Sequence, residues 1–302
     1  MKKSVLSTAF LVVMAAQSAN AVTLYGKANV ALQQVDEAGD SEIELISNSS
    51  RIGLMGDGAV SDNVLVLYRF EYETSVDDGE NSGQTLTQRN IYLGVQTQYG
   101  TLMGGVFDTP LKTAASPVDL FNDLEGDIRN IFAGEIRAKN IVQYVTPKSF
   151  GAVTGKIAYI TKEVDGIDGV SASIAYSDGP IYLAAAMDQD VEDNVANTDT
   201  YRVIGAYTLG DLQIGGAYEK YDNEQGDGDG YFASVQWDIT DQWVFKTQYG
   251  QSDIKVEGRE SFSIGGDYKF TKAIKAFGYF TQNEDDLVRD DDYLGVGMEI
   301  KF

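Results

Sequence analysis

The feature that most restricts the possible folds of this chain is a series of sixteen short segments with a two-residue hydrophobic period. Two kinds of connection alternate between these segments. In residues 22–34, Leu24 and Ala28 alternate with Lys27 and Asn29, the pattern of a β-strand with one apolar face. The expected strands are 22–34, 42–56, 63–74, 85–98, 101–107, 139–147, 152–161, 169–177, 180–187, 200–209, 211–221, 230–239, 242–251, 259–270, 273–283 and 292–302. This series predicts an all-β protein.

Every second connection between these segments is long and acidic, whereas the others are tight turns. The long connections contain 26 of the 46 acidic residues but three of the 23 basic residues; they are 36–40, 77–80, 162–168, 188–199, 222–229, 253–257 and 284–292. An up-and-down barrel places alternate connections on opposite rims. We therefore predict a sixteen-stranded antiparallel transmembrane β-barrel with one acidic rim. Its lumen is too wide for side chains to fill and holds water.

Beyond residue 21, no stretch of the sequence approaches the ~18–20 continuous apolar residues of a transmembrane helix. A barrel instead crosses the bilayer with strands of ~9–11 residues that turn alternate side chains to lipid. Tyr68 and Phe70 would form such an outward set, with Arg69 and Glu71 on the opposite face. For the aromatic residues alone, the core of a soluble β-sandwich is the alternative.

The first 21 residues have the pattern of a cleaved signal peptide. Lys2 and Lys3 precede the apolar run 5–16, and an Ala-x-Ala site ends at Ala21. An uncleaved membrane anchor is the alternative, but the apolar run is short for one. Cleavage would leave a mature barrel of residues 22–302 with 21 basic and 46 acidic residues, a net charge of −25.

The composition excludes several classes of function. The chain contains neither cysteine nor histidine, so it has no thiolate nucleophile, no Ser-His-Asp triad and no histidine-ligated zinc or haem. Its net charge of −23 is the wrong sign for binding nucleic acid. The acidic stretch 224–230 lacks the ligand spacing of a calcium loop. We expect no enzymatic activity, cofactor or specific metal site.

One stretch of about thirty residues, about 108–138, breaks the strand pattern. It is too apolar for an exposed loop, so we expect it to fold against the inner wall of the barrel and to narrow the lumen. Its acidic residues would then face the channel across from basic residues of the wall. The candidate loop acids are Asp119, Asp123, Glu125 and Asp127.

Five motifs make the chain resemble the general diffusion porins of Gram-negative outer membranes. They are LYGKANVAL near the start, SRIGLMG at 50–56, QRNIYLG at 88–94, GVFDTPLK at the insert and YLGVGMEIKF at the end. The resemblance covers the whole mature chain and implies a homotrimer of sixteen-stranded barrels, each narrowed by its third loop. It also implies that the terminal strand, ending in Phe302, is recognised by the outer-membrane assembly machinery.

The resemblance further implies a set of basic residues at the constriction: Lys27, Arg51, Arg89 and Arg137. Lys27 and Arg51 also fall on the lumen face by parity, whereas Arg89 shares its parity with apolar neighbours such as Leu93. Two family features are absent. Val106 stands where the family often has an arginine, and the Pro-Glu-Phe-Gly-Gly motif of the loop is missing.

Together these features predict a passive channel for ions and small hydrophilic solutes in the outer membrane, in contact with lipid and lipopolysaccharide. The acidic charge predicts a weak cation preference. Two alternatives stay open. One is a barrel that serves mainly as an adhesion or receptor surface, and the other is a substrate-specific sugar channel, which would need an aromatic track along the lumen.

Overall fold

The computed structural model describes residues 22–37, 39–79, 83–162, 166–192, 197–224, 226–287 and 289–302. The expected signal peptide, residues 1–21, lies outside them. The strands are β1 (Thr23–Glu37), β2 (Asp40–Ser47), β3 (Arg51–Ser61), β4 (Val64–Glu73), β5 (Thr87–Thr97), β6 (Gly100–Asp108), β7 (Arg137–Val145), β8 (Val153–Ile160), β9 (Gly169–Asp178), β10 (Ile181–Gln189), β11 (Asp199–Leu209), β12 (Leu212–Asn223), β13 (Gly226–Asp238), β14 (Trp243–Ser252), β15 (Arg259–Lys269), β16 (Ile274–Glu284) and β17 (Asp290–Lys301). The short helices are α1 (Pro110–Ala115), η1 (Ile128–Asn130) and η2 (Lys148–Phe150). Within the described residues, no helix has the length and apolar character needed to cross a membrane.

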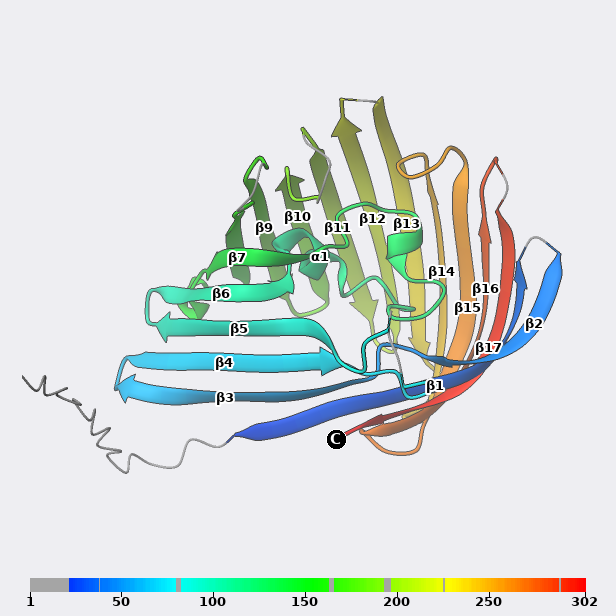
Figure 1. Cartoon of the computed structure of the whole chain (residues 1–302), viewed down its shortest axis with the longest axis horizontal. Coiled ribbons are helices and arrows are strands. Elements are labelled where there is room, and N and C mark those ends of the chain that lie inside the picture. The colour runs from blue at the N-terminus through cyan, green and yellow to red at the C-terminus, as the bar shows by residue number, and fades with distance from the viewer. Residues whose placement is uncertain are drawn as a thin grey trace, which may run out of the picture.

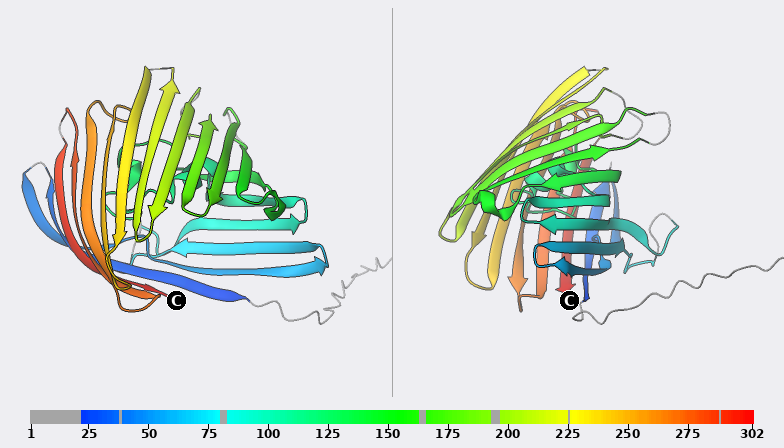
Figure 2. Two further views of the ribbon diagram at one scale, coloured as in Figure 1. Left: turned by 180° about the vertical axis from the view of Figure 1, so that it is seen from behind. Right: turned by 90° about the vertical axis from the view of Figure 1, so that its left-hand side faces the viewer.

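Consecutive strands pair antiparallel around a closed ring (Figure 1). The ring closes where β1 pairs with β17, from Lys27 opposite Lys301 to Glu37 opposite Asp291. On its other side β1 pairs with β2 and then with β3, which are two parts of one barrel strand. The predicted sixteen-stranded antiparallel barrel is therefore confirmed. Seen from behind, β9 to β17 form one continuous wall of tilted strands (Figure 2).

The predicted unbroken strand 42–56 is wrong, because the chain leaves the ladder at residues 48–50. Ser49 adopts a left-handed backbone with φ of 49°. Beside it, the Ser50 hydroxyl accepts a hydrogen bond from the Asn29 backbone N–H at 2.9 Å and also donates to the Asn29 carbonyl oxygen at 3.1 Å. A serine side chain thus replaces a ladder bond, which lets the strand bend without leaving backbone groups unpaired.

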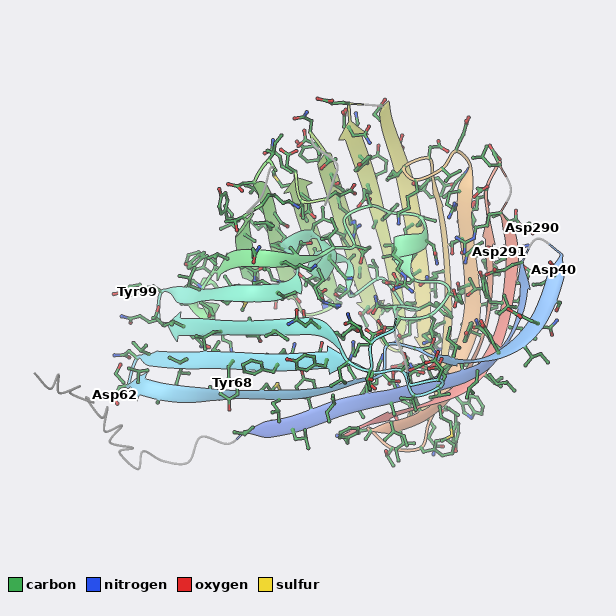
Figure 3. All side chains as sticks on the ribbon, in the orientation of Figure 1. Asp40, Asp62, Tyr68, Tyr99, Asp290 and Asp291 are labelled. Atoms are coloured by element: carbon green, nitrogen blue, oxygen red, sulfur yellow. The ribbon has the colours of Figure 1, made fainter. Side chains whose placement is uncertain are left out.

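Two of the predicted acidic loops are largely strand. Residues 36–37 and 40 continue the β1–β2 ladder, with Glu37 opposite Asp40, and residues 222–223 and 226–229 continue the β12–β13 ladder, with Asp222 opposite Asp227. Pairing continues because it satisfies the backbone hydrogen bonds of both strands, whatever their charge. Figure 3 shows Asp40, Asp290 and Asp291 at one end of the barrel and Asp62 and Tyr99 at the other.

Large apolar side chains cover the outer surface of the barrel. They are exposed in this single chain, and examples are Leu93 at 63% and Val203 at 55%. Exposed aromatic residues gather near the short turns: Tyr99, Phe150, Tyr207, Trp237, Trp243 and Phe270. An apolar band with aromatic residues at its border is the surface that a bilayer requires. Two aromatic residues of β16, Phe277 and Tyr279, are instead buried and pack with Phe121 of the insert.

The main apolar cores lie between the insert and the wall. Thr109 caps α1 by accepting the Lys112 backbone N–H at 3.2 Å, and Pro110 occupies the first turn, where its missing N–H costs nothing. The largest cluster joins insert residues to small and aromatic wall residues of β10–β13: Leu111, Ala114, Ala115, Val118, Ile128, Ile131 and Phe132 with Ala184, Ala186, Ile204, Ala217 and Phe232. The helix α1 lies against β9 and β10, and Figure 1 shows it in front of the back wall of the ring.

Candidate pore-lining site

The four candidate bases come from four different strands. Lys27 lies in β1, and Arg51 is the first residue of β3, directly after the break in the second barrel strand. Lys27 and Arg51 are opposite each other in the ladder. Arg89 lies in β5, and Arg137 begins β7 at the end of the insert.

A bulge explains the orientation of Arg89. The ladder between β4 and β5 shifts register after Phe70, so that Arg89 and Asn90 together oppose Glu71. The extra residue reverses the side-chain alternation. Arg89 is therefore only 8% exposed, although Leu93 has the same parity and is 63% exposed. Parity alone had left the orientation of Arg89 open.

A tight turn of the insert presents Asp123 to these bases. The Asp127 carboxylate accepts backbone N–H groups from Asp123 at 3.1 Å and Arg129 at 2.9 Å, and the side-chain amide of Asn122 at 3.3 Å. Asp123 itself has a left-handed backbone, with φ of 68°, a conformation that aspartate tolerates better than most residues. Asp127 thus fixes the backbone from which the Asp123 side chain projects.

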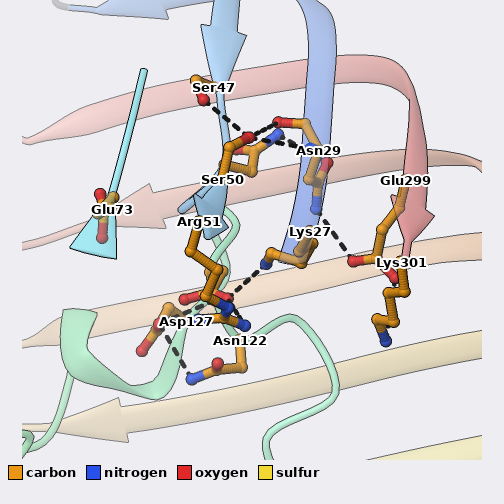
Figure 4. A network of polar contacts seen from close by, with 12 residues as sticks. Lys27, Asn29, Ser47, Ser50, Arg51, Glu73, Asn122, Asp127, Glu299 and Lys301 are labelled. Carbon is orange, nitrogen blue, oxygen red and sulfur yellow. Dashed lines mark hydrogen bonds and ion pairs between the residues drawn. The ribbon is translucent and has the colours of Figure 1, made fainter. Parts of the chain in front are cut away.

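Three of the four bases converge on Asp123. The Asp123 carboxylate lies 2.7 Å from Lys27 Nζ, 3.4 Å from Arg51 Nη2 and 3.9 Å from Arg89 Nη2. Although burial acts to raise it, the three bases lower the pKa of Asp123 to about 2. Figure 4 shows Lys27 and Arg51 projecting from the wall toward the turn that holds Asn122. Loop acid and wall bases are thus in direct contact, with no open gap between them.

The other three candidate acids have different surroundings. Asp119 and Asp127 are 8% and 4% exposed and both accept hydrogen bonds from Asn122 within the insert. Burial, with Asp127 nearby, raises the pKa of Asp119 well above its usual value. Glu125 approaches Gln33 of β1, whose amide nitrogen lies 3.5 Å away, and burial raises its pKa. Of the four candidate acids, only Asp123 contacts the basic set, by which we mean Lys27, Arg51, Arg89 and Arg137.

Arg137 has a different partner from the other three bases. Its Nε lies 3.1 Å from an Asp108 oxygen at the point where the insert leaves β6. Arg89 also pairs with Glu71, at 3.4 Å, and with Glu73. The candidate bases are therefore held by carboxylates of both the insert and the neighbouring strands.

These groups line one cavity of about 650 Å³. All four candidate bases line it, as do the acids Asp123 and Asp127 but not Asp119 or Glu125. The sequence reasoning missed other lining groups: Tyr25, Arg69, Lys112, Arg129 and Lys301. Strand parity could have identified two of these lining residues. Tyr25 shares a face of β1 with Lys27, and Arg69 shares a face of β4 with Glu71. In the described part of the chain, no three acidic side chains are grouped to hold a metal ion.

A second buried ion network fastens the far end of the insert. The fully buried Arg202 of β11 donates to Glu219 of β12 at 2.6 Å, to Glu135 at 2.7 Å and to the Ala133 carbonyl oxygen at 2.7 Å. Glu219 also accepts the Ala133 backbone N–H at 2.6 Å. We call Arg202, Glu219, Glu135 and Ala133 the clasp. It holds the insert against β11 and β12, and sequence reasoning did not find it.

The closed antiparallel ring, its apolar outer band and its charged inner wall define an outer-membrane β-barrel of the channel type. A model of the Gram-negative porin family matches residues 7–287. The chain belongs to this family and is an integral outer-membrane β-barrel. Porins are known as passive diffusion channels and not as enzymes.

Curated relatives and solved structures agree with this assignment. The chain is 23% identical to a "Monosaccharide porin" of Halomonas sp. over 268 residues, which cover 74% of this chain and 72% of the relative. It is 26% identical to "Porin-like protein L" of Photobacterium profundum over 253 residues, covering 77% and 73%. In fold it is similar to OmpF of Salmonella typhi, with a TM-score of 0.79 at 18% identity, covering 94% of this chain and 98% of that one. It is also similar to OmpT of Vibrio cholerae in a trimer form, with a TM-score of 0.69 at 18% identity, covering 94% and 100%.

Proposed function

We propose that this protein is a weakly selective diffusion channel for ions and small hydrophilic solutes, and that its insert forms the narrowest part of the pore. The contact of Asp123 with Lys27, Arg51 and Arg89 carries the proposal, because it joins the insert to the wall on the β1–β5 side. The clasp joins the same insert to β11 and β12. A segment held on both sides of a lumen restricts the passage between them.

The acidic rim favours a weak preference for cations. Its carboxylates raise the local cation concentration at one mouth, where salt screens them readily. The cavity beside the insert carries an excess of bases, which opposes this preference in the narrow part. We therefore propose that selectivity depends on salt, with cations favoured when the Debye length is long.

The test is the reversal potential of the purified channel in a planar bilayer under a potassium chloride gradient, measured near 0.1 M and near 1 M salt. The Debye length falls from about 10 Å to about 3 Å over this range. We expect cation preference at the lower concentration and a smaller preference at the higher one. Anion preference at 0.1 M would contradict the rim argument, and absence of conductance would contradict the channel and favour an adhesion or receptor surface.

We also propose that the protein is a homotrimer embedded in outer-membrane lipid and lipopolysaccharide, and that residues 1–21 are removed. A solved relative in trimer form supports the first part. For assembly, the terminal Phe302 exchanges backbone hydrogen bonds with Gly26 of β1, at 2.9 and 3.1 Å, so recognition of the last strand by the assembly machinery would couple to barrel closure. Mass measurement of the native complex and of the mature chain tests both parts.

A sugar channel is the second candidate, because one relative is named a monosaccharide porin. Tyr25 gives the cavity an aromatic ring, but that ring is covered by Arg69, whose guanidinium carbon lies 5.2 Å from its centroid. Saturable uptake of glucose into liposomes would support this candidate. Uptake that rises linearly with glucose concentration would favour general diffusion.

A further inference from the structure

The inner wall next to the basic set has an unusual arrangement of aromatic and charged side chains. In the ladder, Tyr25 of β1, Gly53 of β3 and Glu71 of β4 lie in one row. Tyr25 lies across Gly53, where an added Cβ would be 2.5 Å from the ring, and its hydroxyl donates to Glu71 at 2.8 Å. Gly53 is thus the gap that lets the tyrosine lie flat on the wall.

This arrangement occupies Glu71 completely. Its two oxygens accept hydrogen bonds from the Tyr25 hydroxyl and from the Asn90 amide at 3.1 Å, and one of them also lies 3.4 Å from Arg89 Nε in an ion pair. Glu71 is 4% exposed, which leaves little room for another donor. The carboxylate nearest to Arg69 along β4 is therefore already committed to other groups.

Among the described residues, Arg69 forms no direct ion pair with a carboxylate, and the charge of Glu71 acts on it only at longer range. Its guanidinium lies over the Tyr25 ring, and a terminal nitrogen contacts only the Met55 sulfur at 4.0 Å. In the described part of the chain, its buried Nε has no hydrogen-bond acceptor, and a solute cannot reach this atom. The Arg69 side chain as a whole is half-buried, so its terminal nitrogens can donate to an acceptor that a solute supplies.

The cavity that Arg69 lines is basic in an acidic protein. Its lining side chains comprise eight bases and five acids, a formal charge of +3. The whole chain has a net charge of −23. Low-dielectric walls strengthen such a local excess, so this part of the pore attracts anions while the rim repels them.

We propose that Arg69, supported by Tyr25 and with Arg51 lining the same cavity, forms a binding subsite for the phosphate or carboxylate group of a small solute. A planar guanidinium presents paired donors to either group, and its stacking on the tyrosine ring holds it in place before binding. Arg51 is one-quarter exposed and is held at only one corner by Asp123. The inference rests on the proposed channel function and names a solute class that the channel would retain during passage.

The experiment compares three solutes with the same three-carbon skeleton: glycerol 3-phosphate, glycerate and glycerol. Binding is measured by isothermal titration calorimetry on the folded protein in a neutral detergent, and potassium chloride conductance is measured separately in bilayers. We expect the two anions to bind and glycerol not to bind. Arg69→Met should weaken anion binding about tenfold, as expected for loss of a charged hydrogen bond. Arg69→Lys should weaken it less.

Arg259→Met is the matched control, because it removes one positive charge from a residue that pairs with Asp285 at 2.8 Å and does not line the cavity. It should leave anion binding unchanged. Equal binding by wild type and Arg69→Met, or equal loss in Arg69→Met and Arg259→Met, would overturn the subsite. Anion binding that depends on Arg69 in a protein without conductance would support the subsite and contradict the channel function.

Discussion

Replacing Arg202 with methionine tests whether the clasp fixes the insert. Arg202 and Glu219 have fully buried side chains, and Glu135 is 8% exposed. The substitution removes three hydrogen bonds, leaves the buried Glu219 without its ion-pair partner, and leaves Glu135 with Lys112 at 4.0 Å as its remaining ion-pair partner. Removing one partner of a buried ion pair typically costs about 3–5 kcal/mol, so the free energy of unfolding should fall by roughly that amount. The same loss should free the insert and increase current noise in single channels.

The cost of this substitution should depend on pH. Burial raises the pKa of Glu135 above the usual glutamate value even though Arg202 acts to lower it. A carboxyl with a raised folded-state pKa contributes stability at low pH, and this contribution disappears as pH rises through that pKa. Without Arg202 the pKa of Glu135 rises further. Arg202→Met should therefore cost less at pH 5 than at pH 8.

The assay is urea unfolding of the refolded protein in detergent, followed by tryptophan fluorescence, at both pH values. The double variant Arg202→Met/Glu219→Gln is the informative control, because it removes one stranded carboxylate while the glutamine oxygen still accepts the Ala133 N–H. It should be more stable than Arg202→Met alone. Equal costs at pH 5 and pH 8, or a double variant less stable than the single one, would refute the reasoning.

Two further predictions concern the insert turn and the barrel closure. Since Asp123 has a pKa of about 2, it contributes about 2 kcal/mol to the free energy of unfolding at neutral pH, and this contribution should be lost as pH falls from about 4 to 2. Asp123→Asn should abolish this step in acid titrations of stability and shift the reversal potential toward chloride. An unchanged acid profile would contradict the contact between Asp123 and the bases. Gly26→Ala should lower the free energy of unfolding by about 1–3 kcal/mol, because its Cβ would lie 2.3 Å from the Phe302 ring and 2.8 Å from the Arg51 carbonyl oxygen. The control Gly278→Ala, with its nearest atoms at 3.7 Å, should be tolerated, and equal effects of the two substitutions would contradict the closure argument.

The sequence by itself determined the strands, their number and the two kinds of rim. A period of two and turn residues are local properties, and a one-residue slip would turn every apolar side chain of a strand from lipid to water. The same parity correctly placed Lys27 and Arg51 on one face and separated Arg69 and Glu71 from Phe70. Local pattern was therefore sufficient for the barrel itself.

Tertiary structure decided the details that depend on contacts between distant segments. The bulge that turns Arg89 inward and the break after Ser47 depend on hydrogen bonds to neighbouring strands, which no local period records. The selection of Asp123 from four acids depends on a turn capped by Asp127. Arg202 meets Glu135 across 67 residues of sequence. Such pairs arise only when the ring closes and brings the wall and the insert together, and their burial then makes each unpaired charge costly.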